Sequence, residues 1–232
     1  MKKLTKILAM TALAALLLMM LGGCSSEQED KTKPAELITP DVIELPAGSP
    51  AEEPAAEPAQ DNGTQRQDGE RFEGVIILEG MEETVRYEHV RNNTVGFEMD
   101  YDYESFVRQN ETVHERFVSQ YDNPAAPQNY LEVIWQAQDA ETVADSVGNE
   151  LSKKYDITRE PYTLEHAGSC IRIDASATKD GHTPDLLQAV YIIPSGSGCL
   201  VAAAHYSFEG AEGFGRRFAS MLNTLTVLSR AE

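Results

Sequence analysis

Hydrophobic and polar residues alternate along much of the chain after residue 71. The clearest example is the segment 130–138, where Leu131, Val133 and Trp135 share one face and mainly polar residues share the other. Alternation with a period of two is typical of a β-strand that is buried on one side. The same pattern predicts further strands, which we place at 72–78, 81–90, 94–99, 106–107 (a short strand or a turn), 114–121, 159–164, 169–178, 185–193 and 199–208.

Two segments show helical periodicity instead. Asp139 is a suitable N-cap, and apolar residues recur at every fourth position from Val143, so the pattern predicts a helix over 140–155. Near the C-terminus, the apolar residues that begin with Phe214 have the spacing of one helical face. They predict a second helix over 210–225.

The order of these elements is a run of strands, a helix, three further strands and a final helix. This order predicts an α+β fold, in which an antiparallel sheet carries a middle helix and a C-terminal helix packed on it. Residues 71–232 suffice for one domain with a hydrophobic core, and no internal repeat divides them. We therefore expect a single α+β domain, preceded by a disordered linker.

The first 24 residues have the features of an export signal. Three lysines lie within residues 1–6, the uncharged stretch 7–21 follows, and Gly22 and Gly23 precede Cys24. The uncharged stretch suits the core of a signal peptide better than a membrane span, which needs about 20 apolar residues. This order of charge, apolar core, small residues and cysteine resembles the lipobox of bacterial lipoproteins.

The resemblance to bacterial lipoproteins implies that residues 1–23 are a signal peptide that is removed. It also implies a diacylglyceryl group on Cys24, which would anchor the protein in the cell membrane, on its extracytoplasmic face. Two or more acyl chains hold a protein stably on a membrane where one chain is marginal. An ordinary signal peptide or an uncleaved anchor is the alternative that these residues leave open.

Residues 24–70 have the composition of a disordered linker. The segment 25–70 is rich in Glu, Pro, Ala, Gln and Ser and contains no aromatic residue, and the stretch 47–60 is repetitive. Such a sequence cannot bury enough apolar surface to offset the entropy of ordering the chain. We expect an acidic tether between the lipidated cysteine and the domain that begins at residue 71.

The chain is strongly acidic, with 38 Asp and Glu residues against 19 Lys and Arg and a net charge of −19. A nucleic-acid-binding domain carries a basic patch, so this balance predicts no nucleic-acid partner. The chain also lacks the basic clusters that bind lipid headgroups. The predicted membrane contact is therefore through the lipid anchor, and an envelope protein is the candidate partner.

The element order resembles that of the PsbP-like and DcrB-like domains found in many bacterial lipoproteins. Three passages carry the likeness: Val95-Gly96-Phe97-Glu98-Met99, the strand and helix of 130–155, and the strands and helix of 167–228. The resemblance implies an α+β fold and the role of an accessory or binding module. It transfers no site residue, and the strand pair 72–90 precedes the usual start of the family pattern.

Cys170 and Cys199 are the thiols of the predicted domain, and the exported compartment permits a disulfide between them. Both lie near the starts of strands that run in the same direction, with 185–193 between them. Two strand spacings separate them by about 9–10 Å, whereas a disulfide needs Cα atoms within about 7 Å. The expected register places Cys170 opposite Pro194 and Cys199 opposite Ile193, on different faces. Two buried thiols are therefore favoured over the candidate disulfide, which a bulge would permit.

The titratable residues offer little specific chemistry. The run Asp100-Tyr101-Asp102-Tyr103-Glu104 could bind a cation or a sugar, but it lacks the spacing of an EF-hand, and a solvated edge is the simpler interpretation. No Gly-rich dinucleotide motif or nucleophile elbow is present. The histidines lack the spacings of metal sites; they are His89, His114, His166, His182 and His205. We therefore predict no catalytic residue, no metal and no cofactor.

These patterns favour a lipid-anchored extracytoplasmic binding or accessory module, and they leave its specific task open. The alternative is an envelope hydrolase or carbohydrate-binding protein that uses the clustered acids Asp100, Asp102 and Glu104. A purely structural spacer is a third interpretation, which predicts neither a ligand nor a partner.

Overall fold

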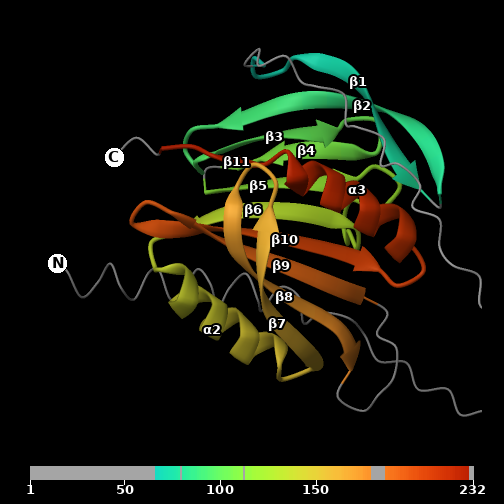
Figure 1. Cartoon of the computed structure of the whole chain (residues 1–232). Helices are drawn as coiled ribbons and strands as arrows, with labels where there is room; N and C mark the ends of the chain where they lie inside the picture. Colours follow the sequence, from blue (N-terminus) through green and yellow to red (C-terminus); the bar gives the residue numbers. More distant parts are fainter. Residues whose placement is uncertain (1–65, 79, 112, 179–185, 230–232) are drawn as a thin grey trace, which may run out of the picture. The chain divides into compact units, whose positions relative to one another are not determined.

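A computed structural model describes residues 66–78, 80–111, 113–178 and 186–229. The chain divides into two units, Met1–Gln65 and Arg66–Glu232, and the described fold belongs to the second. Its strands form two antiparallel sheets, of four and seven strands (Figure 1). No helix among the described residues is long and apolar enough to cross a membrane.

The smaller sheet has the strand order β1-β2-β3-β11 and joins the first strands of the unit to its last one. β1 and β2 form a hairpin whose turn contains Gly80 at a φ of 77°, a conformation that favours glycine. The four strands are β1 (Arg71–Leu78), β2 (Met81–Asn92), β3 (Phe97–Asp102) and β11 (Thr226–Val227).

The larger sheet has the strand order β4-β5-β6-β10-β9-β8-β7, so its last four strands in sequence form an antiparallel meander next to β6. Its strands are β4 (Phe106–Asn110), β5 (His114–Ser119), β6 (Tyr130–Gln136), β7 (Tyr155–Leu164), β8 (Gly168–Thr178), β9 (Leu186–Ser195) and β10 (Gly198–Ser207).

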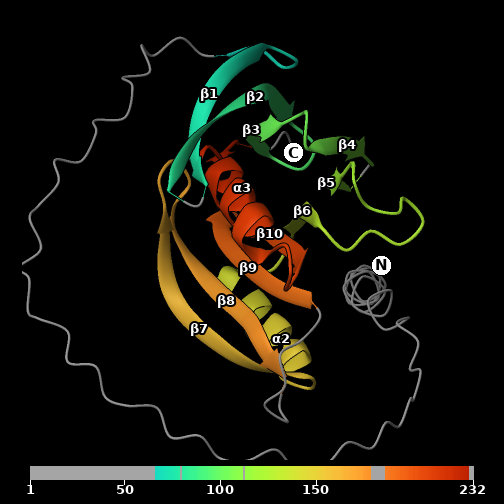
Figure 2. The same cartoon turned by 90° about the vertical axis from the view of Figure 1, so that its right-hand side faces the viewer.

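Two helices pack on opposite faces of the larger sheet within the described residues. α2 (Ala140–Leu151) lies against β7, β8 and β9, and the Asp139 side chain caps it by accepting a hydrogen bond from the Thr142 backbone N–H at 2.9 Å. α3 (Ala211–Asn223) contacts β10 of the larger sheet and β1 and β3 of the smaller one (Figure 2). α3 therefore links the two sheets.

The main hydrophobic core lies where the two sheets meet α3. β3 contributes Phe97, β4 contributes Phe106, β5 contributes Phe117, and α3 contributes Phe218. The Phe106 and Phe218 rings lie 5.0 Å apart. Burying side chains of this size supplies most of the favourable free energy of folding.

The predicted α+β fold class is wrong, because the protein is mainly β-sheet and its strands form two sheets. The segments predicted to be helical do contain α2 and α3, but these helices are minor parts of the fold. Alternation with a period of two identifies strands without revealing which strands pair. β2 of the β1–β2 hairpin pairs with β3, and β11 pairs with the other edge of β3, so these four strands lie outside the expected single sheet.

Two local predictions also need correction. The strand predicted over 94–99 ends too early, because β3 continues to Asp102. The strand predicted over 185–193 also ends too early, because β9 continues to Ser195, and Gly196 takes the left-handed conformation with a φ of 56°. In both places, pairing with a neighbouring strand extends the regular structure beyond what local turn signals indicate.

Candidate functional site

A hollow of about 250 Å³ lies between α3 and the inner face of β7–β10. The core residues Phe218 and Leu222 of α3 are among its lining residues. Its lining residues are Tyr162, Arg172, Ala189, Tyr191, Ala204, Tyr206, Ala211, Glu212, Gly215, Arg216, Phe218, Ala219 and Leu222.

Small residues on both sides create this hollow. Ala189 in β9 and Ala204 in β10 form part of its sheet wall, while Gly215 and Ala219 lie on α3. A Cβ atom added at Gly215 would meet the Tyr206 ring at 3.7 Å, an ordinary van der Waals contact. Larger side chains at these positions would fill the space, so the hollow depends on a set of small residues that are distant in sequence.

Arg172 forms the polar part of the sheet wall. Its guanidinium lies 5.2 Å from the centre of the Tyr162 ring and 5.6 Å from that of Tyr191, within the range of cation–π attraction. Asp174, two residues along the same strand, accepts a hydrogen bond from Nη2 of Arg172 at 2.9 Å. Burial opposes the charge, but the Asp174 hydrogen bond and nearby groups raise the pKa of Arg172 overall. Its charge is therefore fixed and already paired.

Three tyrosines supply rings and hydroxyl groups to the hollow. The Tyr162 and Tyr191 rings meet edge to face, with centroids 5.6 Å apart. Burial raises the pKa of Tyr191 to about 12 and also raises the pKa of Tyr206, so both stay neutral at physiological pH. Within the described part of the chain, none of the three hydroxyls has a hydrogen-bond partner. Each is therefore able to donate to, or accept from, a bound molecule.

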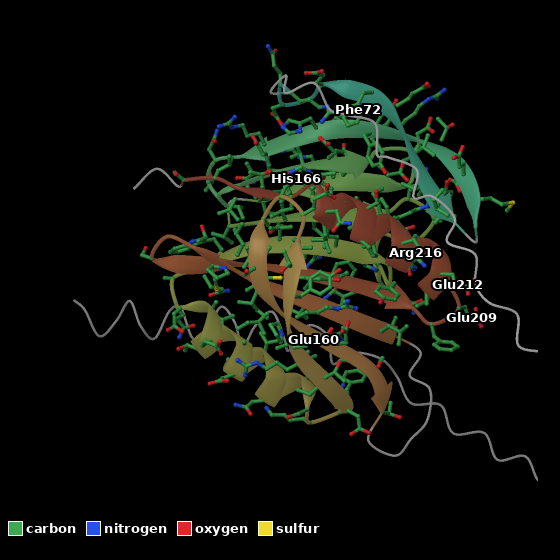
Figure 3. All side chains as sticks on the ribbon, viewed as in Figure 1. Phe72, Glu160, His166, Glu209, Glu212 and Arg216 are labelled. Carbon is green, nitrogen blue, oxygen red and sulfur yellow. The ribbon has the colours of Figure 1, made fainter. Side chains whose placement is uncertain are left out.

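Arg216 and Glu212 lie one helical turn apart on α3 and line the hollow. Both are exposed, and Figure 3 shows them near Glu209 at the N-terminal end of this helix. Among the described residues, Arg216 has neither an ion pair nor a hydrogen bond to a side chain. The adjacent Arg217 differs, because it donates to Asp102 at 2.7 Å and also pairs with Glu83. Arg216 is thus a positive charge available to a ligand.

The clustered acids of the β3 region do not line this hollow. The expected solvated edge is wrong for two of them, because strand alternation buries Asp100 and Asp102 on one face of β3. Asp100 accepts a hydrogen bond from His89 Nδ1 at 2.7 Å, Asp102 accepts one from Arg217, and Glu104 accepts one from an arginine of β2 at 2.8 Å. Each carboxylate is therefore held by a separate cationic or histidine partner.

Cys170 and Cys199 are free, buried thiols on opposite faces of the larger sheet. Cys170 belongs to the core beside α3, and Cys199 pairs in register with Pro194, one residue from the expected partner Ile193. Burial raises the pKa of both thiols to about 11. Cys24, the predicted lipidation site, lies outside the described residues.

The histidines occupy separate environments. His89 lies in the small sheet, His114 faces Glu132 on β6 at 3.8 Å, and His205 is buried in β10 against Tyr130. No three His, Cys, Asp or Glu side chains of the described ranges form a group with the geometry of a metal site. His182 falls outside these ranges.

Sequence reasoning did not identify the residues that line the hollow. One available signal lies in the strand 169–178, where the charged residues Arg172 and Asp174 alternate with apolar residues. Charged residues at alternate positions of a strand in a core-forming meander indicate a polar cavity or a buried ion pair.

No known protein family matches this chain, and no curated protein matches it. Among solved structures, a crystal structure of a Bacteroides thetaiotaomicron VPI-5482 protein at 1.50 Å resolution resembles it with a TM-score of 0.40 and 13% identity. The match covers 72% of this chain and 51% of the other, so the chain spans about half the length of that protein. This likeness is too distant to indicate a function.

Proposed function

We propose that this protein is a lipid-anchored extracytoplasmic binding module whose binding site is the hollow between α3 and β7–β10. The observation that carries the proposal is a space lined by three tyrosines and by Arg216, whose hydroxyls and guanidinium have no hydrogen-bond or ion-pair partner in the described part of the chain. Binding sites for small molecules combine an apolar wall with a few such polar groups. We assign no catalytic step to these residues.

The alternative, a hydrolase or carbohydrate-binding protein built on clustered acids, has less support. Asp100 and Asp102 are buried and paired, and Glu104 is bound to Arg86. A catalytic carboxylate has to reach a substrate and exchange a proton with it. Asp100 and Asp102 instead hold β3 to β2 and to α3, and the exposed Glu104 pairs with Arg86.

Filling the hollow tests the binding proposal. Ala219 is an exposed residue of α3, so Ala219→Leu should occupy the space without disturbing the core. The full chain in detergent is screened against small envelope metabolites by thermal shift. A ligand that binds the folded state stabilises it by about 2.7 kcal/mol when present at about 100 times its Kd. The proposal predicts a ligand that raises the Tm of the wild type but not that of Ala219→Leu.

The matched control is Ala126→Leu, which adds the same side chain to an exposed loop away from the hollow. This variant should respond to the ligand as the wild type does. An equal response from wild type and Ala219→Leu to every ligand, or no response at all, would contradict the proposed binding site.

The anchoring part of the proposal rests on Cys24 and the residues before it. Metabolic labelling with an alkyne-bearing fatty acid should label the wild-type protein and the Cys170→Ser variant, but not Cys24→Ser. An unlabelled wild type, or labelling that survives in Cys24→Ser, would show that the anchor is absent or lies elsewhere.

A further inference from the structure

Arg216 stands apart from the other arginines around α3. Arg217 pairs with Asp102 and Glu83, and Arg172 pairs with Asp174, whereas Arg216 has no such partner in the described residues. This is notable in a chain with 38 acidic and 19 basic residues, where acidic partners are abundant. An arginine fork that faces a cavity binds a carboxylate through two parallel hydrogen bonds.

Glu212 limits the kind of anion that this arginine could bind. It lies one turn before Arg216 on the rim of the same hollow, and it too has no partner in the part of the chain that the structure describes. A second negative charge on a ligand would be repelled by this carboxylate, whereas a ligand hydroxyl would donate to it. The rim therefore favours a single negative charge accompanied by hydroxyl groups.

The walls of the hollow fit a ring. Tyr162, Tyr191 and Tyr206 offer aromatic surface together with unpaired hydroxyls, while Ala189 and Ala204 leave room beside them. With a volume of about 250 Å³, the hollow has room for one ring with its substituents.

From these features we infer that the hollow binds a small ring-bearing carboxylate that also carries hydroxyl groups. The ligand carboxylate contacts Arg216, its hydroxyls contact Glu212 and the tyrosine hydroxyls, and its ring lies over the alanine and tyrosine wall. This inference rests on the proposed binding function and specifies the ligand class for the same site.

The test is isothermal titration of the full chain in detergent with three probes: glucuronate, glucose and benzoate. Glucuronate carries ring, hydroxyls and charge, glucose lacks the charge, and benzoate lacks the hydroxyls. We expect glucuronate to bind about tenfold or more tightly than either of the other two, the usual effect of a charge-assisted hydrogen bond or of several neutral ones.

Two variants assign the effect to Arg216. Arg216→Gln removes the charge but keeps a good helix former, so it should weaken glucuronate about tenfold or more and leave glucose unchanged. Lys154→Gln removes the same charge from an exposed turn outside the hollow, and it should leave every affinity unchanged.

Three results would overturn the inferred ligand class: equal affinities for glucuronate and glucose, tighter binding of benzoate, or no effect of Arg216→Gln. No binding of any probe would overturn it as well. These results would leave the proposed binding function standing. That function is contradicted if wild type and Ala219→Leu respond equally to every ligand in the thermal-shift screen.

Discussion

Replacing His205 with phenylalanine should make the stability of the folded unit less dependent on pH. His205 is 5% exposed in β10, and its ring stacks on Tyr130 with centroids 4.4 Å apart. Its Nε2 atom is buried without a hydrogen-bond partner among the described residues. Burial, assisted by the charge of Arg116, lowers the pKa of His205 from 6.5 to about 3. The imidazole therefore stays neutral in the folded state at pH values where the unfolded chain takes up a proton.

The sign and size of the effect follow from this difference in proton binding. Because the unfolded state binds the proton below about pH 6.5 and the folded state does so only near pH 3, the free energy of unfolding decreases as the pH falls through this window. Each pH unit well inside the window removes about 1.4 kcal/mol. Between pH 7 and pH 4.5, His205 should account for a loss of about 2–3 kcal/mol in the free energy of unfolding.

Urea unfolding of the full chain in detergent, followed by circular dichroism at both pH values, measures this loss. His205→Phe keeps a stacked ring that cannot be protonated, so it should lose about 2–3 kcal/mol less than the wild type. Titration of other groups cancels in the comparison. His166→Gln, at an exposed hairpin position, serves as the control and should behave as the wild type. Losses that agree within about 0.5 kcal/mol between wild type and His205→Phe would refute the reasoning.

Three further outcomes can be measured on the same protein. Arg108→Ala should lower the free energy of unfolding by about 3 kcal/mol, because it leaves the fully buried Glu115 without its charged partner; a urea midpoint within error of wild type would contradict this. Gly198→Ala should destabilise by about 1–3 kcal/mol, since the added Cβ would lie 2.1 Å from a carbonyl oxygen of β6; an unchanged thermal midpoint would show that the strand yields freely. Cys170 and Cys199 should resist iodoacetamide at pH 8 in the native protein, because burial raises the pKa of both thiols to about 11. Both should be alkylated in denaturant without reductant. If intact mass spectrometry finds neither thiol alkylated in denaturant, the two cysteines form a disulfide.

Local features of the fold could be predicted from the sequence because they depend on neighbouring residues. The Asp139 cap and the apolar stripe behind it lead to α2, and the alternation of 130–138 leads to β6. Strand partners could not be predicted, because pairing is decided by contacts between distant segments. Asp100 illustrates this: its neighbours in sequence indicate a solvated edge, whereas its partner His89 on β2 makes it a buried strand residue.

The candidate site was hidden for the same reason. Ala189, Ala204 and Gly215 are each unremarkable in their own strand or helix, and the space that they leave exists only when α3 packs over β9 and β10. Arg216 looks like any exposed helix residue until its ion-pair partners are compared with those of Arg217. Among the lining residues, Arg172 is the one whose position indicates a polar cavity from the sequence, because it is a charged residue within a strand of alternating apolar residues.

The small sheet also has a consequence for the order in which the protein folds. β11 pairs with β3. Ser220 of α3 forms a hydrogen bond with Tyr87 of β2, 133 residues away in the sequence. Arg217 of α3 donates a hydrogen bond to Asp102 of β3, 115 residues away. A chain that emerges N-terminus first can form the β1–β2 hairpin early, but it cannot complete the packing of the small sheet until α3 and β11 are available. Folding of this unit should therefore be slow and should occur only after α3 and β11 have been synthesised. Until then, the unpacked β1–β2 hairpin is the segment most exposed to aggregation.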